Sequence, residues 1–311
     1  MKTTSSRLPR CLHLVFAVGA LLFSLPAPAA RAAESLVVTT IVDEDNGTSD
    51  PSVGGGTSLR EAINFANSDG VNSAITFSAT AFAAPRKTIV LNGTVLPALL
   101  ANNGNTVSIT APAAGVKISG NNASRIFYID RATVTMTGLT LRNGNATSDF
   151  GGALYNLGGL LVMDSCTLSA NDGGHGGAIA TNGFFAGGFP PNTILRNCTI
   201  SGNTAVGHGG GVYTFAGPIL IDSCTITENI SDRDFNYFGE GGGVYSNPQY
   251  TNTIVRNSII AGNTDFSRND IAPSGDFQSQ GYNLIGVGDS TGAFTATGDR
   301  SSVRATRALD S

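Results

Sequence analysis

Five short segments with a shared pattern of apolar residues constrain the fold more than any other feature of the sequence. They read TVTMTGLTL, LLVMDSCTL, NTILRNCTI, PILIDSCTI and NTIVRNSII. Aligned on the residue two places before the end, they are spaced by 27, 32, 26 and 34 residues, at Leu139, Cys166, Cys198, Cys224 and Ser258. A period of this size indicates a solenoid, a propeller or another array of repeats.

The step between buried positions identifies the kind of array. Numbered from the aligned residue as zero, positions −3 and +2 are always apolar, and position zero is Leu, Cys or Ser. Side chains point alternately to the two faces of a strand. Positions −3 and 0 are three residues apart, an odd step, so on a straight strand one of them would be buried and the other exposed. A bend at −2 and −1 removes the conflict, and small residues at −1 suit it: Gly138, Ser165, Asn197, Ser223 and Asn257.

Two short inward-facing strands joined by a bend predict one coil of a parallel β-helix. A propeller would need antiparallel hairpins, and the segments lack regular hairpin signals. Four repeats continue with an asparagine at the same offset, which we interpret as a turn: Asn171, Asn203, Asn229 and Asn263. Glycine clusters such as Gly209–Tyr213 follow, and we expect each to lead into a third strand.

The amino-terminal residues have the pattern of a secretory signal peptide. A basic start precedes the apolar run CLHLVFAVGALLFSL, and Ala30-Arg31-Ala32 fits a cleavage site. We therefore expect residues 1–32 to be removed and the protein to be exported. No later segment is long and apolar enough to predict a transmembrane helix.

Charge narrows the range of partners. Residues 1–32 contain four of the 18 Lys and Arg and no acid, so the remaining chain has 14 basic and 22 acidic residues, a net charge of −8. An acidic chain of this kind argues against nucleic acid and anionic membrane as partners. Surface glycans or proteins remain as possible partners, and we expect no cofactor.

A single helix is predicted before the repeats, over Ser58–Asn67. Ser58 and Glu61 have the spacing of a capping box, and Leu59, Ala62, Ile63 and Ala66 form one apolar face. The first coil of a solenoid otherwise exposes an apolar edge, so we interpret this helix as its cap.

At this point the chain resembles known bacterial surface proteins. TSLREAINFANSDG resembles the CSLREA domain, with Thr57 where that family has Cys, and the partner Cys of the family's disulfide is missing as well. Gly151–Leu154 and Gly176–Ile179 are similar to the Gly-Gly-Ala-aliphatic motif of polymorphic outer membrane proteins. Asn257–Gly286 resembles the end region of choice-of-anchor proteins.

The resemblance implies an all-β, right-handed parallel β-helix of the pectin-lyase-like type, located outside the cell or on its outer surface. We expect a signal peptide at 1–32, a CSLREA-like cap with the first strands at 33–105, β-helix repeats at 106–290 and an irregular, truncated tail at 291–311. The resembling families carry no catalytic signature that could be transferred to this sequence.

Three cysteines follow the signal peptide, at Cys166, Cys198 and Cys224. Stacked parallel strands lie ~4.8 Å apart, whereas a disulfide needs Cβ atoms nearer ~3.8 Å with converging bonds. We therefore predict a buried ladder of free thiols. A redox or zinc site is the alternative, although the sequence has no C-x-x-C pair.

Two histidines are candidates for a metal site. His175 and His208 each precede a Gly-Gly pair, and Glu240 and Phe150 occupy the equivalent places in neighbouring repeats. Stacked about 5 Å apart, His175, His208 and Glu240 could be three zinc ligands. The alternative is a surface turn that accepts different side chains at this position, because Phe150 occupies the equivalent place in a neighbouring repeat.

Position −2 alternates in charge through Asp164, Arg196, Asp222 and Arg256. This pattern could be catalytic, because lyases of the same fold use Arg with acid-bound calcium. A calcium site clusters its acids, so the alternation favours an exposed salt-bridge ladder.

Two loops contain candidate ligand-binding residues. NISDRDFNYFGE carries Phe235, Tyr237 and Phe238 beside Asp232 and Asp234, and the loop Gly183–Pro191 carries three further phenylalanines. These aromatic side chains could bind sugar or protein, or could pack over the coil edge. We therefore expect a structural, adhesive or ligand-binding surface protein, with a polysaccharide lyase or glycoside hydrolase as the alternative.

Overall fold

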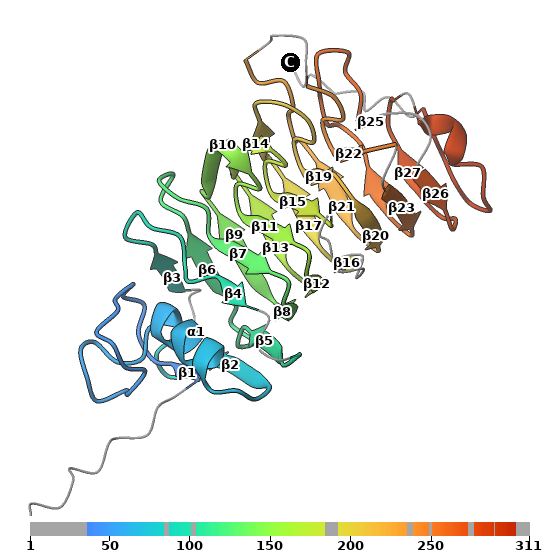
Figure 1. The fold of residues 1–311 in the computed structure, drawn as a ribbon. Helices are drawn as coiled ribbons and strands as arrows, with labels where there is room; N and C mark the ends of the chain where they lie inside the picture. Colours follow the sequence, from blue (N-terminus) through green and yellow to red (C-terminus); the bar gives the residue numbers. More distant parts are fainter. Residues whose placement is uncertain are drawn as a thin grey trace, which may run out of the picture. The chain divides into compact units, whose positions relative to one another are not determined.

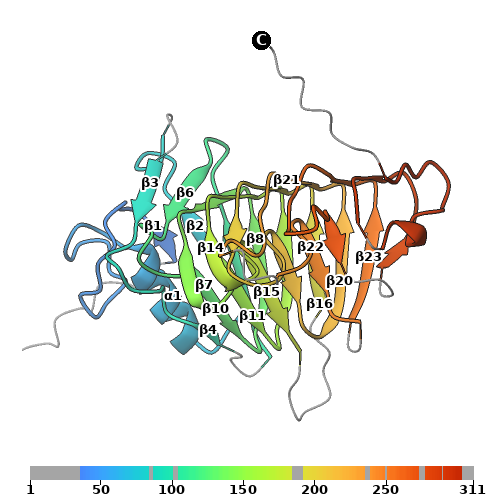
Figure 2. The same cartoon turned by 90° about the horizontal axis from the view of Figure 1, so that it is seen from above.

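The computed structural model describes residues 36–83, 87–100, 104–183, 192–234, 239–248, 251–272, 277–288 and 290–302, which lie within one compact unit, residues 33–311. Most regular structure in these residues is strand, arranged in parallel sheets (Figures 1 and 2). The predicted signal peptide and the loop phenylalanines at 184, 185 and 189 lie outside the described residues. No helix among the described residues could cross a membrane.

Within the described residues, sheet A has nine strands and contains the first strand of each repeat. Its order follows the chain, with each strand separated from the next by the rest of a coil. The strands are β1 (Val37–Val38), β2 (Ser73–Phe77), β5 (Thr106–Thr110), β8 (Thr133–Thr137), β12 (Leu160–Asp164), β16 (Asn192–Arg196), β20 (Gly217–Asp222), β23 (Thr251–Arg256) and β26 (Phe277–Ser279).

Sheet B, in the part of the chain that the structure describes, has eight strands and contains the second strand of each repeat. It consists of β3 (Lys87–Val90), β6 (Val116–Ser119), β9 (Leu139–Arg142), β13 (Thr167–Ser169), β17 (Thr199–Ser201), β21 (Thr225–Thr227), β24 (Ile259–Ile260) and β27 (Leu284–Ile285).

Sheets C and D are built from the residues after the glycine clusters and just before them. Sheet C consists of β4 (Leu99–Leu100), β7 (Phe127–Asp130), β11 (Leu154–Leu157), β15 (Ile179–Asn182), β19 (Val212–Thr214), β22 (Val244–Ser246) and β25 (Ile271–Ala272). Sheet D consists of β10 (Asn145–Phe150), β14 (Asp172–His175) and β18 (Thr204–Ala205). All strand pairs in these sheets are parallel. The strands of sheet C follow the glycine clusters, so the predicted third strand of the repeat is confirmed.

The bend predicted at positions −2 and −1 is confirmed. Residues at −1 have left-handed backbone, with φ of 70° at Gly138, 55° at Ser165 and 52° at Asn197. This conformation costs least for glycine and asparagine. It lets Met163 at −3 and Leu168 at +2 both point inward, where each is fully buried.

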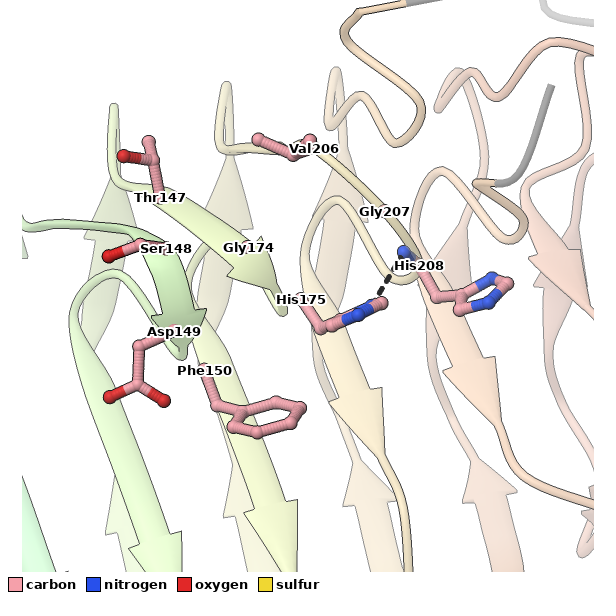
Figure 3. Close-up of a pocket in the computed structure, with 9 residues that line it drawn as sticks. All are labelled: Thr147, Ser148, Asp149, Phe150, Gly174, His175, Val206, Gly207 and His208. Atoms are coloured by element: carbon pink, nitrogen blue, oxygen red, sulfur yellow. Dashed lines mark hydrogen bonds between the residues drawn. The ribbon is translucent and has the colours of Figure 1, made fainter. Parts of the chain in front are cut away.

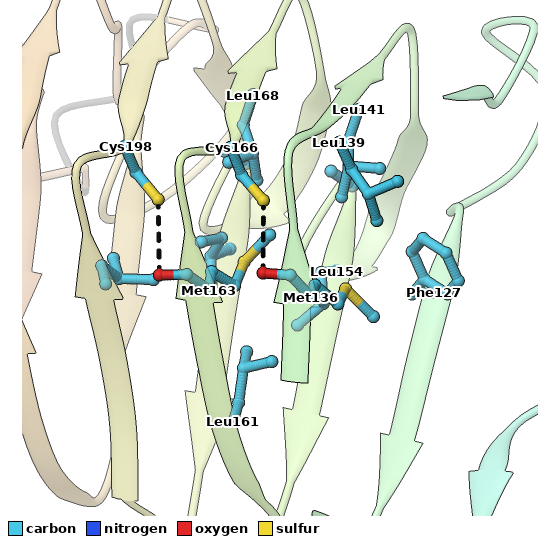
Figure 4. Packing of buried hydrophobic residues seen from close by; sticks show 14 of the residues in the cluster. Phe127, Met136, Leu139, Leu141, Leu154, Leu161, Met163, Cys166, Leu168 and Cys198 are labelled. Carbon is cyan, nitrogen blue, oxygen red and sulfur yellow. Dashed lines mark hydrogen bonds between the residues drawn. The ribbon is translucent and has the colours of Figure 1, made fainter. Parts of the chain in front are cut away.

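The interior is a continuous apolar core in which equivalent side chains of successive coils stack (Figure 4). Cys166, Cys198 and Cys224 are at most 2% exposed and are not joined by disulfides, as predicted. Their thiols contact the main chain of the preceding coil, with Sγ of Cys166 3.5 Å from the Met136 carbonyl oxygen. All three thiols are shielded from solvent, so we expect them to be unreactive in the folded protein.

The asparagines predicted as turns form a buried polar ladder. Nδ2 of Asn171 donates to Oδ1 of Asn203 at 2.8 Å, and the same 2.8 Å bond joins Asn203 to Asn229 and Asn229 to Asn263. Each Oδ1 also accepts a backbone N–H of the preceding coil, and the last amide donates to Asp270. These side chains are at most 4% exposed, so they are part of the core rather than of a surface turn.

The predicted cap is helix α1 (Leu59–Ser68), and its capping box is present. Ser58 Oγ accepts from Glu61 N at 3.1 Å, while Ser58 N donates to Glu61 Oε2 at 2.8 Å. Its apolar face, which includes Leu59 and Ile63, is buried in the core cluster. At the other end of the chain a short 3-10 helix, η1 (Thr291–Ala293), precedes Phe294, whose ring packs 6.0 Å from that of Phe277.

Candidate functional site

The turn between sheets D and C places one side chain per coil in a row. Gly151, Gly176, Gly209 and Gly241 have φ of 66° to 68°, a conformation suited to glycine. The residues just before them stack as the sequence predicted, because Gly151 N donates to the His175 carbonyl, Gly176 N to that of His208 and Gly209 N to that of Glu240.

Backbone hydrogen bonds fix both imidazole rings of this row. Nδ1 of His175 accepts the backbone N–H of His208 at 3.0 Å (Figure 3). Nδ1 of His208 accepts the backbone N–H of Glu240 at 3.1 Å. A nitrogen that accepts a hydrogen bond carries no proton, so both rings are neutral with the proton on Nε2. Burial lowers the pKa of His175, and burial together with the neighbouring His175 lowers that of His208 to about 4.

This geometry does not suit the candidate metal site of His175, His208 and Glu240. A histidine that binds a metal through one nitrogen donates the N–H of the other to an acceptor. Here Nδ1 of each ring faces a backbone N–H, which is itself a donor. The described residues also contain no group of three His, Cys, Asp or Glu side chains placed to hold a metal ion.

The two histidines belong to a longer row of stacked rings, which we call the aromatic row. His175 packs on Phe150 at 5.5 Å and on His208 at 5.3 Å between ring centroids, and His208 packs on Tyr245 at 4.3 Å. The remaining members are Tyr128, Tyr155 and Tyr213. Ala180 takes the tyrosine position of its coil, so Phe150 reaches across to both Tyr155, at 5.4 Å, and Tyr213, at 5.8 Å.

A groove of 470 Å³ is lined by three members of the aromatic row, Phe150, His175 and His208 (Figure 3). This volume is within the usual range for small-molecule sites. Its walls come from three successive coils and combine hydroxyl groups, one carboxylate, a phenyl ring and the two imidazoles: Thr147, Ser148, Asp149, Phe150, Gly174, His175, Val206, Gly207 and His208.

The carboxylate of the groove is paired with a well-anchored arginine. Arg125 donates to Asp149 Oδ2 at 2.6 Å, and its Nε bonds the carbonyls of Phe150 and Gly151 at 3.0 Å. The guanidinium also lies over the Tyr155 ring, 5.4 Å from its centroid. Burial tends to raise the pKa of Asp149, but the hydrogen bond from Arg125 prevails and holds it below its usual value.

Two glycines of the groove are required by close contacts. A Cβ on Gly174 would lie 2.6 Å from the Asp149 carbonyl oxygen, and one on Gly207 would lie 2.5 Å from Cε1 of His175. The Gly207-His208-Gly209 sequence therefore serves the ring stack: the first glycine makes room for His175, and the last allows the positive φ.

The loop that follows Asn229 starts beside the groove. Backbone N–H of Asp232 donates to the Gly207 carbonyl at 3.1 Å, and Arg233 pairs with Asp172 of β14. Asp232 is 1% exposed, whereas Asp234 is exposed. The remaining candidates of this loop, Phe235, Tyr237 and Phe238, lie outside the described residues.

Sequence reasoning found the histidines but missed Arg125, Thr147, Ser148 and Asp149. The signal was present in the spacing within the repeat. Sheet D pairs Ala146 with Gly173 and Phe150 with His175, so the first coil has two extra residues between these pairs. That bulge carries Ser148 and Asp149 to the groove.

The alternating charges at position −2 lie elsewhere, on sheet A. Asp164 pairs in register with Arg196, and Asp222 with Arg256. Arg256 and Asp222 form an ion pair at 2.7 Å, in line with the predicted salt-bridge ladder.

Comparison with known proteins adds no assignment: no protein-family model, curated protein or solved structure matches the chain.

Proposed function

We propose that this protein is an exported, right-handed parallel β-helix of the pectin-lyase-like type that binds a ligand at the outer surface of the cell. In-register parallel sheets and inward-stacked side chains support the fold, and the resemblance to CSLREA-domain surface proteins supports export. The repeats form a rigid scaffold, on which a site gains precision. An adhesive or structural role is compatible with the same architecture.

The observation that carries the binding role is the groove beside the aromatic row. Phe150 offers an apolar ring, Thr147 and Ser148 offer hydroxyls, and the neutral imidazoles offer Nε2–H donors. A saccharide combines apolar C–H faces with hydroxyls that donate and accept, so it matches this set of groups. The acidic balance of the chain, −4 overall, favours a neutral saccharide over an anionic one.

Binding fits this groove better than glycoside cleavage does. Hydrolysis of a glycosidic bond generally uses two carboxyl groups placed on either side of the bond. Among the described residues that line the groove, Asp149 is the only acid, and it is held by Arg125. A carbohydrate-active enzyme remains the alternative function.

A glycan array with the purified protein tests the proposal, and a screen for lyase and hydrolase products is run beside it. We expect binding to one class of neutral glycan without product release, and about tenfold weaker binding for Phe150→Ala. Tyr282→Ala, which removes a ring that is 65% exposed and does not line the groove, is the control. Full binding by Phe150→Ala refutes the site, and product release supports the enzyme.

A further inference from the structure

The outward face of sheet A carries an aliphatic stripe. Along β12, β16, β20 and β23 the side chains that point away from the core align in register through successive coils. The central row of this stripe is half-buried and aliphatic throughout: Val162, Ile194, Leu220 and Ile254. Leu160, on the same face of β12, is 37% exposed.

A row of alternating charges runs beside this stripe, two residues further along each strand. In coil order it is Asp164, Arg196, Asp222 and Arg256. Figure 1 shows the four strands following one another along the sheet. The stripe and the charge row are therefore parallel lines on one face.

The order of the charges makes this face complementary to itself. When a four-member row of alternating sign is turned end over end, each acid meets a base. A two-fold axis parallel to the strands lays the stripe on its copy and sets Asp164 opposite Arg256, and Arg196 opposite Asp222, of the second chain. An axis along the stack of coils would instead set the charges against Leu160 and Asn252, which carry no charge.

The extent of the overlap corresponds to a weak, concentration-dependent contact. Centred between β16 and β20, the two-fold arrangement pairs six strands, β8 to β26. At ~4.8 Å per strand and ~3.3 Å per residue, a five-residue width gives a footprint of about 475 Å² on each chain. Both chains together bury about 950 Å², which is the size of a weak, reversible interface. Thr135 and Gln278, which meet at its ends, are uncharged.

We propose that the outward face of sheet A binds a second copy of this chain, with the two stacks of coils antiparallel. Burial of the aliphatic stripe supplies the affinity. Charge pairing between the rows sets the register and excludes the parallel arrangement, because rim charges contribute mainly specificity.

Charge exchange tests this dimer. We expect sedimentation velocity to show a concentration-dependent dimer, and Arg196→Asp or Asp222→Arg to weaken it at least about tenfold. Either single change gives positions 196 and 222 the same charge. These positions face each other across the two-fold axis, so two pairs of like charges result. The double variant Arg196→Asp/Asp222→Arg restores opposite pairs and should dimerise again, as should an equimolar mixture of the two single variants.

The rescue separates the proposal from a folding defect. Thermal unfolding of the four proteins checks that each is folded. A wild-type protein that stays monomeric at every concentration tested overturns the proposal. Dimerisation of the single variants with wild-type affinity overturns it as well, because the charge row would then have no part in the contact.

Discussion

The backbone N–H of His208 donates to Nδ1 of His175 at 3.0 Å, so the ring of one coil is held by the main chain of the next. The same bond recurs one coil further, from Glu240 to His208. Protonation of either ring would place a proton on Nδ1, facing another donor. The aromatic row is therefore stable only while its imidazoles are neutral.

Stability should fall in acid because of His208. Its pKa changes from 6.5 to about 4 on folding, chiefly through burial. Between these values the unfolded chain binds a proton that the folded chain does not, so the free energy of unfolding decreases as the pH drops through this window. We expect a loss of about 2–3 kcal/mol, measured by urea unfolding at pH 7 and pH 4.

His208→Asn is the matched control for this pH effect. Its Oδ1 can take the place of Nδ1 as acceptor for the Glu240 N–H, and it does not titrate. The difference in stability between the wild type and this variant should depend on pH. Parallel pH curves for the two proteins would contradict the assignment to His208.

Gly207→Ala should destabilise the protein by about 1–3 kcal/mol, because the added Cβ would overlap the His175 ring. Gly292→Ala is the comparison, since a Cβ there meets no atom within 4 Å and its φ is not positive. Thermal melts of both variants give the measurement. Equal melting temperatures would mean that His175 moves aside without cost.

Asn203→Ala should cost about 3 kcal/mol, well above the effect of an ordinary surface change. The substitution removes the acceptor for the backbone and side-chain N–H of Asn171, and the donor to the Leu168 carbonyl. These groups are buried and would stay unpaired. Asn64→Ala, at an exposed place in α1, should cost about 0.5 kcal/mol or less in the same urea titration.

The three cysteines should react with a thiol reagent only after unfolding. Each is at most 2% exposed, so a reagent reaches the thiols only when the chain opens. Labelling in native buffer, followed by mass spectrometry, should show little modification of Cys166, Cys198 and Cys224, and labelling in denaturant should modify all three. Rapid native labelling of all three would disprove the buried ladder.

The positions of the apolar residues within the repeat were sufficient to predict much of the fold. Met163 and Leu168 are five positions apart, an odd step, and are both apolar, which required a bend between them. Ser165 has the left-handed backbone that makes this bend. Helix α1 was predictable because Ser58 and Glu61 form a local cap whose partners are three residues apart.

The candidate site was less predictable because it depends on contacts between coils. Asn203 was interpreted as a turn, since polar residues usually lie outside; its burial follows from partners about 30 residues away that satisfy its amide. Asp149 reaches the groove because of a bulge between Ala146 and Phe150, where β10 pairs with β14. Such a register shift has no signature in hydrophobic periodicity.

The asparagine ladder has a direction, and this sets a rule for how the protein can change in length. Every amide donates toward the next coil and accepts from the one before, so any coil with this asparagine can follow any other. The position after the last asparagine needs a side chain that only accepts hydrogen bonds. Asp270 fills it and accepts both the side-chain and the backbone N–H of Asn263. Whole coils could thus be duplicated or lost while the terminating carboxylate stays the same, which makes the number of repeats an evolvable property of an otherwise fixed design.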